Sequence, residues 1–221
     1  MNISVIGAGY VGLITGIGFA KLNHQVSIVD LNDDLIKNLN ENRPPFYEPE
    51  LVDYLNDSNI RNNLFFSTSY QKSINENTDI VFVCVQTPTD PDTGKTKTDY
   101  ISSVLTELKK IERFNFIVCI KSTIKATLVE KISNEIDLDY KKIIFNPEFL
   151  REGSAFYDFF NPDRIVIGGS DQKGLNQCTE LYESFDCEKI ITDSNSSQMI
   201  KYLSNTYLAM RLSFVNETYR L

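Results

Sequence analysis

Three glycines near the amino terminus have the spacing of a loop that binds the pyrophosphate of a dinucleotide. Gly7, Gly9 and Gly12 follow a short apolar run and precede a helical pattern. In a strand–turn–helix unit, such glycines allow a tight turn, close approach of the backbone to a pyrophosphate, and close packing of helix on strand. The helix N-terminus adds unpaired N–H groups and the positive end of its dipole. We therefore predict that this loop, which includes Tyr10 and Val11, binds a dinucleotide.

An acidic residue ends the next predicted strand. Residues 26–29 have strand character, and Asp30 follows them. A carboxylate at this position accepts a hydrogen bond from a ribose 2′-hydroxyl and repels a 2′-phosphate, so it favours NAD over NADP. The alternative interpretation is an ordinary βαβ unit whose second strand is followed by an aspartate.

Polar side chains also follow three later predicted strands. These residues are Thr87, Thr123 and Glu148. Because the carboxyl ends of parallel strands meet at one edge of a sheet, we expect all three to face the same crevice, where one ligand can contact them. Taken singly, each is equally consistent with a capping or turn residue.

Charged residues near the end of the chain suggest a second group. Glu148 and Glu152 flank residues 149–151, and we expect Arg151 to pair with one of these two glutamates. Lys201 and Asn205 lie four positions apart, which places them on one face of a helix, where they can donate to a developing oxyanion. A surface loop, a solvated lysine and a surface asparagine are the alternatives.

Apolar runs and periodicity predict the elements that position these residues. Their alternation predicts an α/β fold of Rossmann type with a doubly wound, mainly parallel sheet. The predicted strands cover residues 3–6, 26–29, 64–67, 80–85, 116–120, 143–145, 165–169 and 190–191. The predicted helices follow Gly12 and cover residues 33–42, 50–55, 100–113, 125–136, 173–185 and 196–221, and the proline-rich residues 43–49 form a loop.

The last predicted helix differs from the rest of the chain. We assign residues 1–195 to a cofactor-binding domain and residues 196–221 to the start of a long helix. Neither glycine nor proline marks the end of this helix, so we expect the chain to be truncated there. Its apolar residues recur at helical steps and are Ile200, Leu203, Tyr207, Met210 and Phe214.

Composition excludes several classes of function. The formal net charge of −8 argues against binding to nucleic acid or to an anionic membrane. No apolar run is long enough to span a bilayer. The four cysteines lack a Cys-x-x-Cys pair, which predicts reduced thiols in a cytoplasmic protein. The single His24 is too isolated to predict a metal site.

Taken together, the motifs resemble those of the nucleotide-sugar 6-dehydrogenases in the UDP-glucose/GDP-mannose dehydrogenase family. The resemblance is closest to the members that act on UDP-glucose, and it extends over nearly the whole chain. Its most specific part is Asn-Pro-Glu-Phe-Leu-Arg-Glu-Gly at residues 146–153. The other matching segments are residues 7–12, 86–89, 121–123 and 201–209.

The resemblance implies an NAD-dependent, four-electron oxidation of a sugar CH₂OH group to a carboxylate through a cysteine thioester. It implies that Thr123 and Glu148 position a water or transfer protons, and that Lys201 and Asn205 stabilise the oxyanion. It places Thr87, Thr123 and Glu152 at the cofactor, and Glu148, Phe149, Leu150, Arg151, Glu152, Lys201 and Asn205 at the sugar nucleotide.

The sequence departs from the family pattern in two places. The position five residues after Asp30, often basic in the family, is Leu35. The family's nucleophile lies in a downstream Cys-Phe-Pro-Lys-Asp-type motif that these residues do not contain, and none of the four cysteines has that context. We therefore expect this chain to bind NAD but to be inactive alone. The resemblance also implies a homodimer, formed through the last helix in the full-length enzyme.

Two alternatives remain open at this level. The chain could be a catalytically incomplete NAD-binding module, because such a module shares every cofactor residue. An enzyme of the same family could instead act on GDP-mannose or a UDP-N-acetyl-hexosamine. The form of residues 149–152 and 205–209 favours UDP-glucose.

Overall fold

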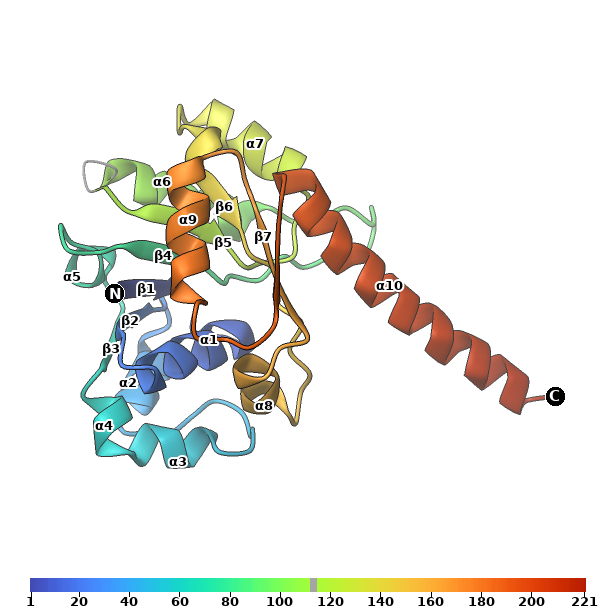
Figure 1. Cartoon of the computed structure of the whole chain (residues 1–221), viewed down its shortest axis with the longest axis horizontal. Coiled ribbons are helices and arrows are strands. Elements are labelled where there is room, and N and C mark those ends of the chain that lie inside the picture. The colour runs from blue at the N-terminus through green and yellow to red at the C-terminus, as the bar shows by residue number, and fades with distance from the viewer. Residues whose placement is uncertain (112–114) are drawn as a thin grey trace.

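The fold is built on one eight-stranded sheet, seen in a computed structural model that describes residues 1–111 and 115–221 (Figure 1). The strand order is β3-β2-β1-β4-β5-β6-β7-β8. The strands are β1 (Asn2–Ile6), β2 (Gln25–Val29), β3 (Leu64–Ser67), β4 (Ile80–Val83), β5 (Ile117–Ile120), β6 (Ile143–Phe145), β7 (Arg164–Gly168) and β8 (Glu188–Thr192).

Helices cover both faces of this sheet, so the predicted doubly wound α/β class is confirmed. The helices are α1 (Tyr10–Lys21), α2 (Asp33–Asn40), α3 (Leu51–Asn56), α4 (Ser58–Arg61), α5 (Tyr70–Ser73), α6 (Asp99–Lys110), α7 (Ala126–Glu135), α8 (Ala155–Phe160), α9 (Gln172–Leu181) and α10 (Ser194–Tyr219), with a 3-10 turn at Tyr140–Lys142.

Strand β4 shows how the sheet holds two cores. Ile80 and Phe82 pack into the apolar cluster beneath α1, α8 and α9, whereas Val81 and Val83 pack into the cluster beneath α6 and α7. Alternate residues of a strand point to opposite faces, so a strand buried on both sides is continuously apolar. This explains why residues 80–83 form an unbroken apolar run.

Some predicted boundaries need correction, and one strand pairing is antiparallel. The helix predicted over residues 100–113 ends at Lys110, and residues 112 and 113 lie outside the described part of the chain. Strand β7 pairs with β6 in the antiparallel direction, while β7 and β8 run parallel to each other. The short helices α4, α5 and α8 were not predicted, because four to six residues do not establish a helical period.

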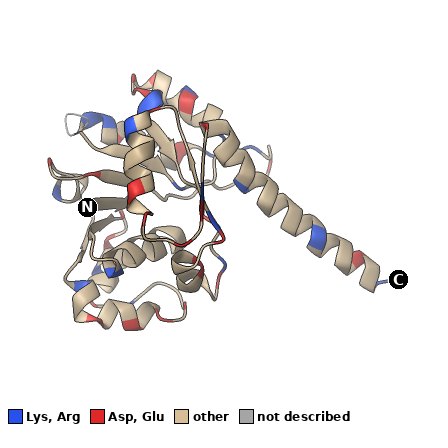
Figure 2. Cartoon of the chain, in the orientation of Figure 1, with Lys and Arg blue, Asp and Glu red and all other residues tan. Residues whose placement is uncertain are grey.

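Helix α10 projects away from the sheet (Figure 1). Asp193 caps its start by accepting hydrogen bonds from the N–H groups of Asn195 and Ser196. Only the first turns pack on the domain, where Ser197, Gln198 and Lys201 are buried. Beyond them the helix is exposed, and few of its residues are charged (Figure 2). None of the helices in the described ranges is both long and apolar enough to cross a membrane.

Candidate active site

Two glycines of the loop between β1 and α1 are required by the fold itself. Gly7 has a φ of +101°, and a Cβ atom there would lie 2.8 Å from the carbonyl oxygen of Cys84. A Cβ atom on Gly12 would lie 1.9 Å from the carbonyl oxygen of Gly7. Backbone atoms cannot move aside as a flexible side chain can, so a larger residue at either position would distort the turn.

Gly9 is different because its surroundings are open. Its φ of −74° and ψ of −170° are extended values that any residue adopts, and a Cβ atom there would have no neighbour within 4 Å. The first helical hydrogen bond runs from the Leu13 N–H to the Gly9 carbonyl. The N–H groups of the first turn therefore precede the helical ladder and can bind a phosphate. The absence of a side chain at Gly9 leaves room for such a group.

Asp30 lies beside this loop at the end of β2. One carboxylate oxygen accepts a hydrogen bond from the Ala8 N–H at 2.9 Å, and the other accepts one from the Asn32 N–H at 3.0 Å. The side chain remains partly exposed. A half-exposed carboxylate next to an open phosphate cradle fits the adenosine ribose of NAD. Leu35 is only partly buried and packs against the core of the domain.

The loops after β4 and β5 meet at the carboxyl edge of the sheet. The Thr87 hydroxyl donates to the Thr123 carbonyl at 2.9 Å, and the Ser122 hydroxyl donates to the Val85 carbonyl at 2.6 Å. The contact between these two strand ends is therefore direct. It runs through a backbone carbonyl, so both threonines help to shape the edge of the sheet.

Glu148 and Lys201 form a buried ion pair. Their atoms Oε1 and Nζ lie 2.9 Å apart, and the two side chains are only 14% and 6% exposed. The other oxygen of Glu148 accepts a hydrogen bond from the Leu150 N–H at 2.7 Å. Because Lys201 belongs to α10, this pair joins the long helix to the segment after β6.

The ion pair lines a cavity of about 680 Å³. Phe149 lies in its wall, with the Arg164 guanidinium 4.2 Å and the Lys201 Nζ atom 5.3 Å from the centre of its ring. Asn205 is exposed and lines the same cavity one turn after Lys201. Glu152 is also exposed. Six predicted site residues line the cavity, namely Glu148, Phe149, Leu150, Arg151, Lys201 and Asn205.

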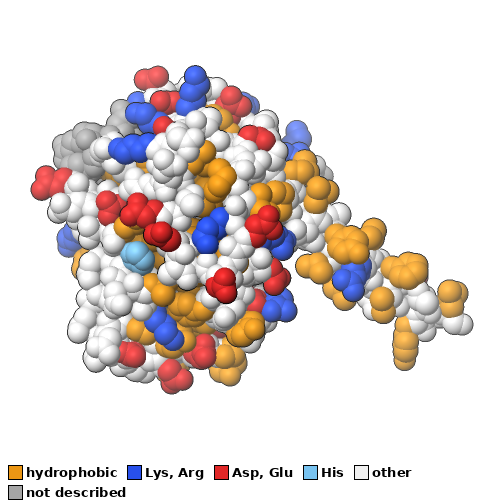
Figure 3. Space-filling view, viewed as in Figure 1, with side chains coloured by type: hydrophobic (Ala, Val, Ile, Leu, Met, Phe, Trp, Pro, Cys, Tyr) orange, Lys and Arg blue, Asp and Glu red, His pale blue; other side chains and the backbone are white. Residues whose placement is uncertain are grey.

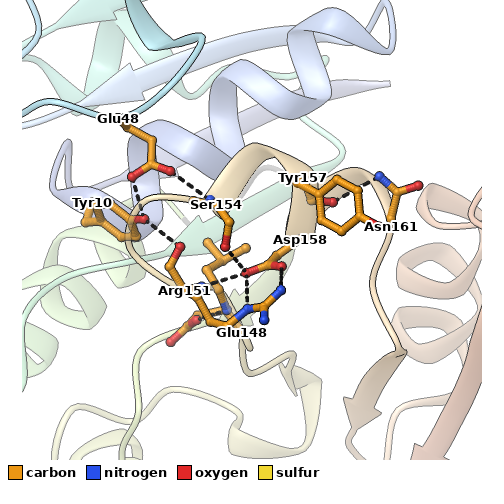
Figure 4. Close-up of polar contacts among 10 residues, drawn as sticks. Tyr10, Glu48, Glu148, Arg151, Ser154, Tyr157, Asp158 and Asn161 are labelled. Atoms are coloured by element: carbon orange, nitrogen blue, oxygen red, sulfur yellow. Dashed lines mark hydrogen bonds and ion pairs between the residues drawn. The ribbon is translucent and has the colours of Figure 1, made fainter.

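The prediction that Arg151 pairs with Glu148 or Glu152 is wrong. The Arg151 guanidinium instead forms a bidentate ion pair with Asp158, with N–O distances of 2.6 and 3.0 Å (Figure 4). Burial alone would raise the pKa of Asp158, but hydrogen bonds from Arg151 and the Arg151 charge keep that pKa below its usual value. This pair was not predicted from the sequence because α8, which carries Asp158, was not predicted.

Two further groups at the site were also missed. Glu48, buried in the proline-rich loop, accepts hydrogen bonds from the Tyr10 hydroxyl and from two backbone N–H groups (Figure 4). Lys121 donates to Asn146 Oδ1 at 3.0 Å, and the Tyr182 hydroxyl donates to the same oxygen at 2.6 Å. The only signal for Glu48 was an acid among prolines and aromatics, which also describes a surface loop.

Three of the four cysteines have thiols that resist ionisation. Burial raises the pKa of Cys84 to about 12, and the pKa values of Cys119 and Cys187 also lie above the ordinary range, mainly through burial. All four cysteines are free, and Cys178 is buried as well. A thiol that stays protonated is a poor nucleophile. Cys84, Cys119 and Cys187 are therefore poorly suited to act as a covalent nucleophile.

The raised pKa of Cys84 predicts a loss of stability at high pH. In the unfolded chain the thiol ionises near 9, whereas in the folded chain it keeps its proton up to about 12. Rising pH therefore favours the unfolded state. Urea titrations at pH 8 and pH 10 measure the free energy of unfolding of the original chain and of Cys84→Ala. Between these two pH values, this free energy should fall by about 1.4 kcal/mol less in Cys84→Ala than in the original chain. Equal falls in the two proteins would contradict the assignment.

Comparison with known proteins agrees with this geometry. Residues 1–186 match the model described as the UDP-glucose/GDP-mannose dehydrogenase family, NAD binding domain. A UDP-glucose 6-dehydrogenase of Bacillus subtilis is 37% identical over 98% of this chain and 50% of its own length, and one of Rhizobium meliloti is 36% identical over 98% and 52%. The chain thus spans about half the length of the curated relatives it matches.

Solved structures of the family have the same fold. A ternary complex of GDP-mannose dehydrogenase from Pseudomonas aeruginosa superimposes with a TM-score of 0.91 at 29% identity, covering 98% of this chain and 52% of that one. A UDP-glucose dehydrogenase from Pyrobaculum islandicum gives a TM-score of 0.88 at 35% identity, covering 98% and 51%. The open cradle at Gly9, with Asp30 beside it, is consistent with the cofactor that the family model names. The chain therefore belongs to the UDP-glucose/GDP-mannose dehydrogenase family and carries its NAD-binding domain.

Proposed function

We propose that this chain supplies the NAD-binding half and one wall of the sugar-nucleotide site of an enzyme that oxidises UDP-glucose to UDP-glucuronate. The observation that carries the proposal is the buried Glu148–Lys201 pair, which lines the cavity together with Phe149 and Asn205. The reaction removes four electrons from the sugar CH₂OH group and passes through a thioester to a cysteine that is none of the four in this chain. NAD, when bound, accepts a hydride in each of the two oxidation steps.

The residues of this chain have separate roles in the proposal. Lys201 and Asn205 donate to the oxygen that gains negative charge at the sugar C6 carbon. Glu148 keeps the Lys201 ammonium in place and, with Thr123, positions a water or transfers a proton. Residues 149–152 line the sugar nucleotide, and Glu152 and Thr87 lie near the cofactor. The aromatic ring of Phe149, flanked by two cations, provides a surface for the substrate.

The organisation of the chain supports the same proposal. In this proposal, residues 1–195 are the cofactor-binding unit, and α10, which starts two residues before its predicted position, connects this unit to the remaining half of an enzyme as long as the relatives. The exposed apolar side chains of this helix include Leu203, Tyr207, Met210 and Phe214 (Figure 3). A large exposed apolar surface marks an interaction site, and we propose that a second copy of the chain covers it in a homodimer. The free cysteines are consistent with a cytoplasmic location.

Turnover by a chimaera tests the proposal. The chain would be continued past Leu221 by the second half of the Bacillus subtilis relative, and NADH formation would be measured with UDP-glucose, GDP-mannose and UDP-N-acetyl-mannosamine. We expect turnover with UDP-glucose by the chimaera and none by the 221-residue chain. Turnover by the short chain would show that the nucleophile lies within it. Turnover with GDP-mannose alone would assign the other substrate, and NAD binding without any turnover would favour an incomplete NAD-binding module.

The charge of Asp30 predicts the choice between NAD and NADP. Asp30→Asn removes the carboxylate that would repel a 2′-phosphate but keeps one oxygen, which can accept from the N–H group of either Ala8 or Asn32. We expect the ratio of the NAD affinity to the NADP affinity to fall about tenfold, as for the loss of one like-charge contact. Calorimetric titration of the 221-residue chain with both dinucleotides measures this ratio. Asp33→Asn, at the exposed start of α2, is the matched control and should leave the ratio unchanged.

A further inference from the structure

Glu48 is a buried carboxylate at the junction of three segments. It is 3% exposed. Its Oε2 atom accepts hydrogen bonds from the Tyr10 hydroxyl and the Gly153 N–H, both at 2.9 Å, and its Oε1 atom accepts one from the Ala155 N–H at 2.8 Å. Figure 4 shows the side chain reaching from the proline-rich loop to Tyr10 and toward the turn before α8.

The three donors explain why this position holds a glutamate. A carboxylate accepts up to about four hydrogen bonds, whereas a glutamine side chain has one acceptor oxygen and would direct its own N–H groups at a donor. Among the ion pairs of the described residues, none neutralises Glu48. Burying a carboxylate that is held only by hydrogen bonds costs desolvation free energy. An apolar side chain would stabilise the loop more if its only role were to fill space.

The segments that Glu48 joins belong to the two ligand sites. Tyr10 is the first residue of α1 and directly follows Gly9, the open position of the phosphate cradle. Its hydroxyl also lies 3.2 Å from the Arg151 carbonyl oxygen. Gly153 has a φ of +86°, and Ala155 is the first residue of α8. The contacts therefore link the first turn of α1 to residues 151–155, a segment that begins with Arg151 in the wall of the cavity.

We propose that Glu48 is a positioning residue that couples NAD binding to the order of residues 149–155. A dinucleotide held by the first turn of α1 restrains Tyr10. Opening of residues 149–155 breaks the contact between the Tyr10 hydroxyl and the Arg151 carbonyl, and it leaves Tyr10 as the one remaining donor of the three on Glu48. Tyr10 and Glu48 can then move together, so a restrained Tyr10 makes that opening less favourable. The proposal rests on the proposed use of residues 149–152 in sugar-nucleotide binding. NAD would thus order the wall of the substrate cavity before the sugar nucleotide arrives.

Amide hydrogen exchange, followed by mass spectrometry, tests this coupling in the 221-residue chain. Exchange is measured without NAD and at saturating NAD. At saturation, differences in NAD affinity between the variants do not affect the measured protection. We expect saturation to slow exchange both in residues 7–13 and in residues 149–155, the latter by at least about fivefold. In Tyr10→Phe, which loses the hydroxyl but keeps the ring, residues 7–13 should still be protected and the protection of residues 149–155 should disappear.

Glu48→Gln should give the same exchange pattern as Tyr10→Phe. If Glu48→Gln fails to fold, Tyr10→Phe still tests the proposal. Tyr47→Phe, which alters an exposed hydroxyl in the same loop, is the matched control and should behave as the original chain. Protection confined to residues 7–13 in the original chain would overturn the coupling. Protection of both segments that persists in Tyr10→Phe would overturn the route through Glu48. If NAD protected neither segment, both the assignment of the NAD-binding loop and the coupling would be wrong. The proposed activity on UDP-glucose is tested separately, by turnover of the chimaera.

Discussion

Gly9→Val is expected to abolish NAD binding while leaving the fold intact. A Cβ atom at Gly9 meets no protein atom within 4 Å, and the backbone there is extended, so valine fits without strain. The added methyl groups would occupy the space that a pyrophosphate needs above the first turn of α1. Losing two charge-assisted hydrogen bonds to the phosphates corresponds to an affinity loss of about 100-fold or more. Calorimetric titration with NAD measures the loss.

Gly12→Ala provides the contrast. Its Cβ atom would lie 1.9 Å from the Gly7 carbonyl oxygen, so this variant should lose both NAD binding and stability to urea. Gly9→Val should stay within about 1 kcal/mol of the original stability, the usual range for a change at a helix cap. If Gly9→Val bound NAD with unchanged affinity, the pyrophosphate would have to bind elsewhere.

Lys201→Met is expected to have the second large effect, on both stability and turnover. It leaves the Glu148 carboxylate buried without its partner, and breaking such a pair costs about 3–5 kcal/mol. In the chimaera, the same change removes a donor to the oxyanion, so turnover should fall about 100- to 1,000-fold. Urea denaturation and NADH formation measure the two effects separately.

A double variant separates these two roles of Lys201. Glu148→Gln combined with Lys201→Met removes both charges and should recover most of the lost stability without recovering turnover. The control is Lys131→Met, which breaks an exposed ion pair with Glu135 and should cost less than about 1 kcal/mol. If the double variant regained activity along with stability, Lys201 would act only through the fold.

The sequence by itself determined the features that depend only on residues close together in the chain. The glycine loop was predicted from residues 7 to 12 alone, because the spacing of its three glycines is a local pattern. The strands β4, β5 and β6 were found at or within two residues of their ends, because a strand buried on both faces is a continuous apolar run. The fold class followed from the alternation of these runs with helical patterns. NAD followed from Asp30 after β2.

Tertiary structure alone decided which charges meet. Arg151 pairs with Asp158 because the short helix α8 turns back over its loop, and Glu48 receives donors more than 100 residues away in the chain. The antiparallel direction of β7 also escaped prediction, since an apolar run has the same composition in either direction. The sequence therefore determined the strands, the longer helices and the cofactor, whose signals are local. The partners of the buried charges depend on contacts between distant segments, which form only when the sheet and its helices pack together.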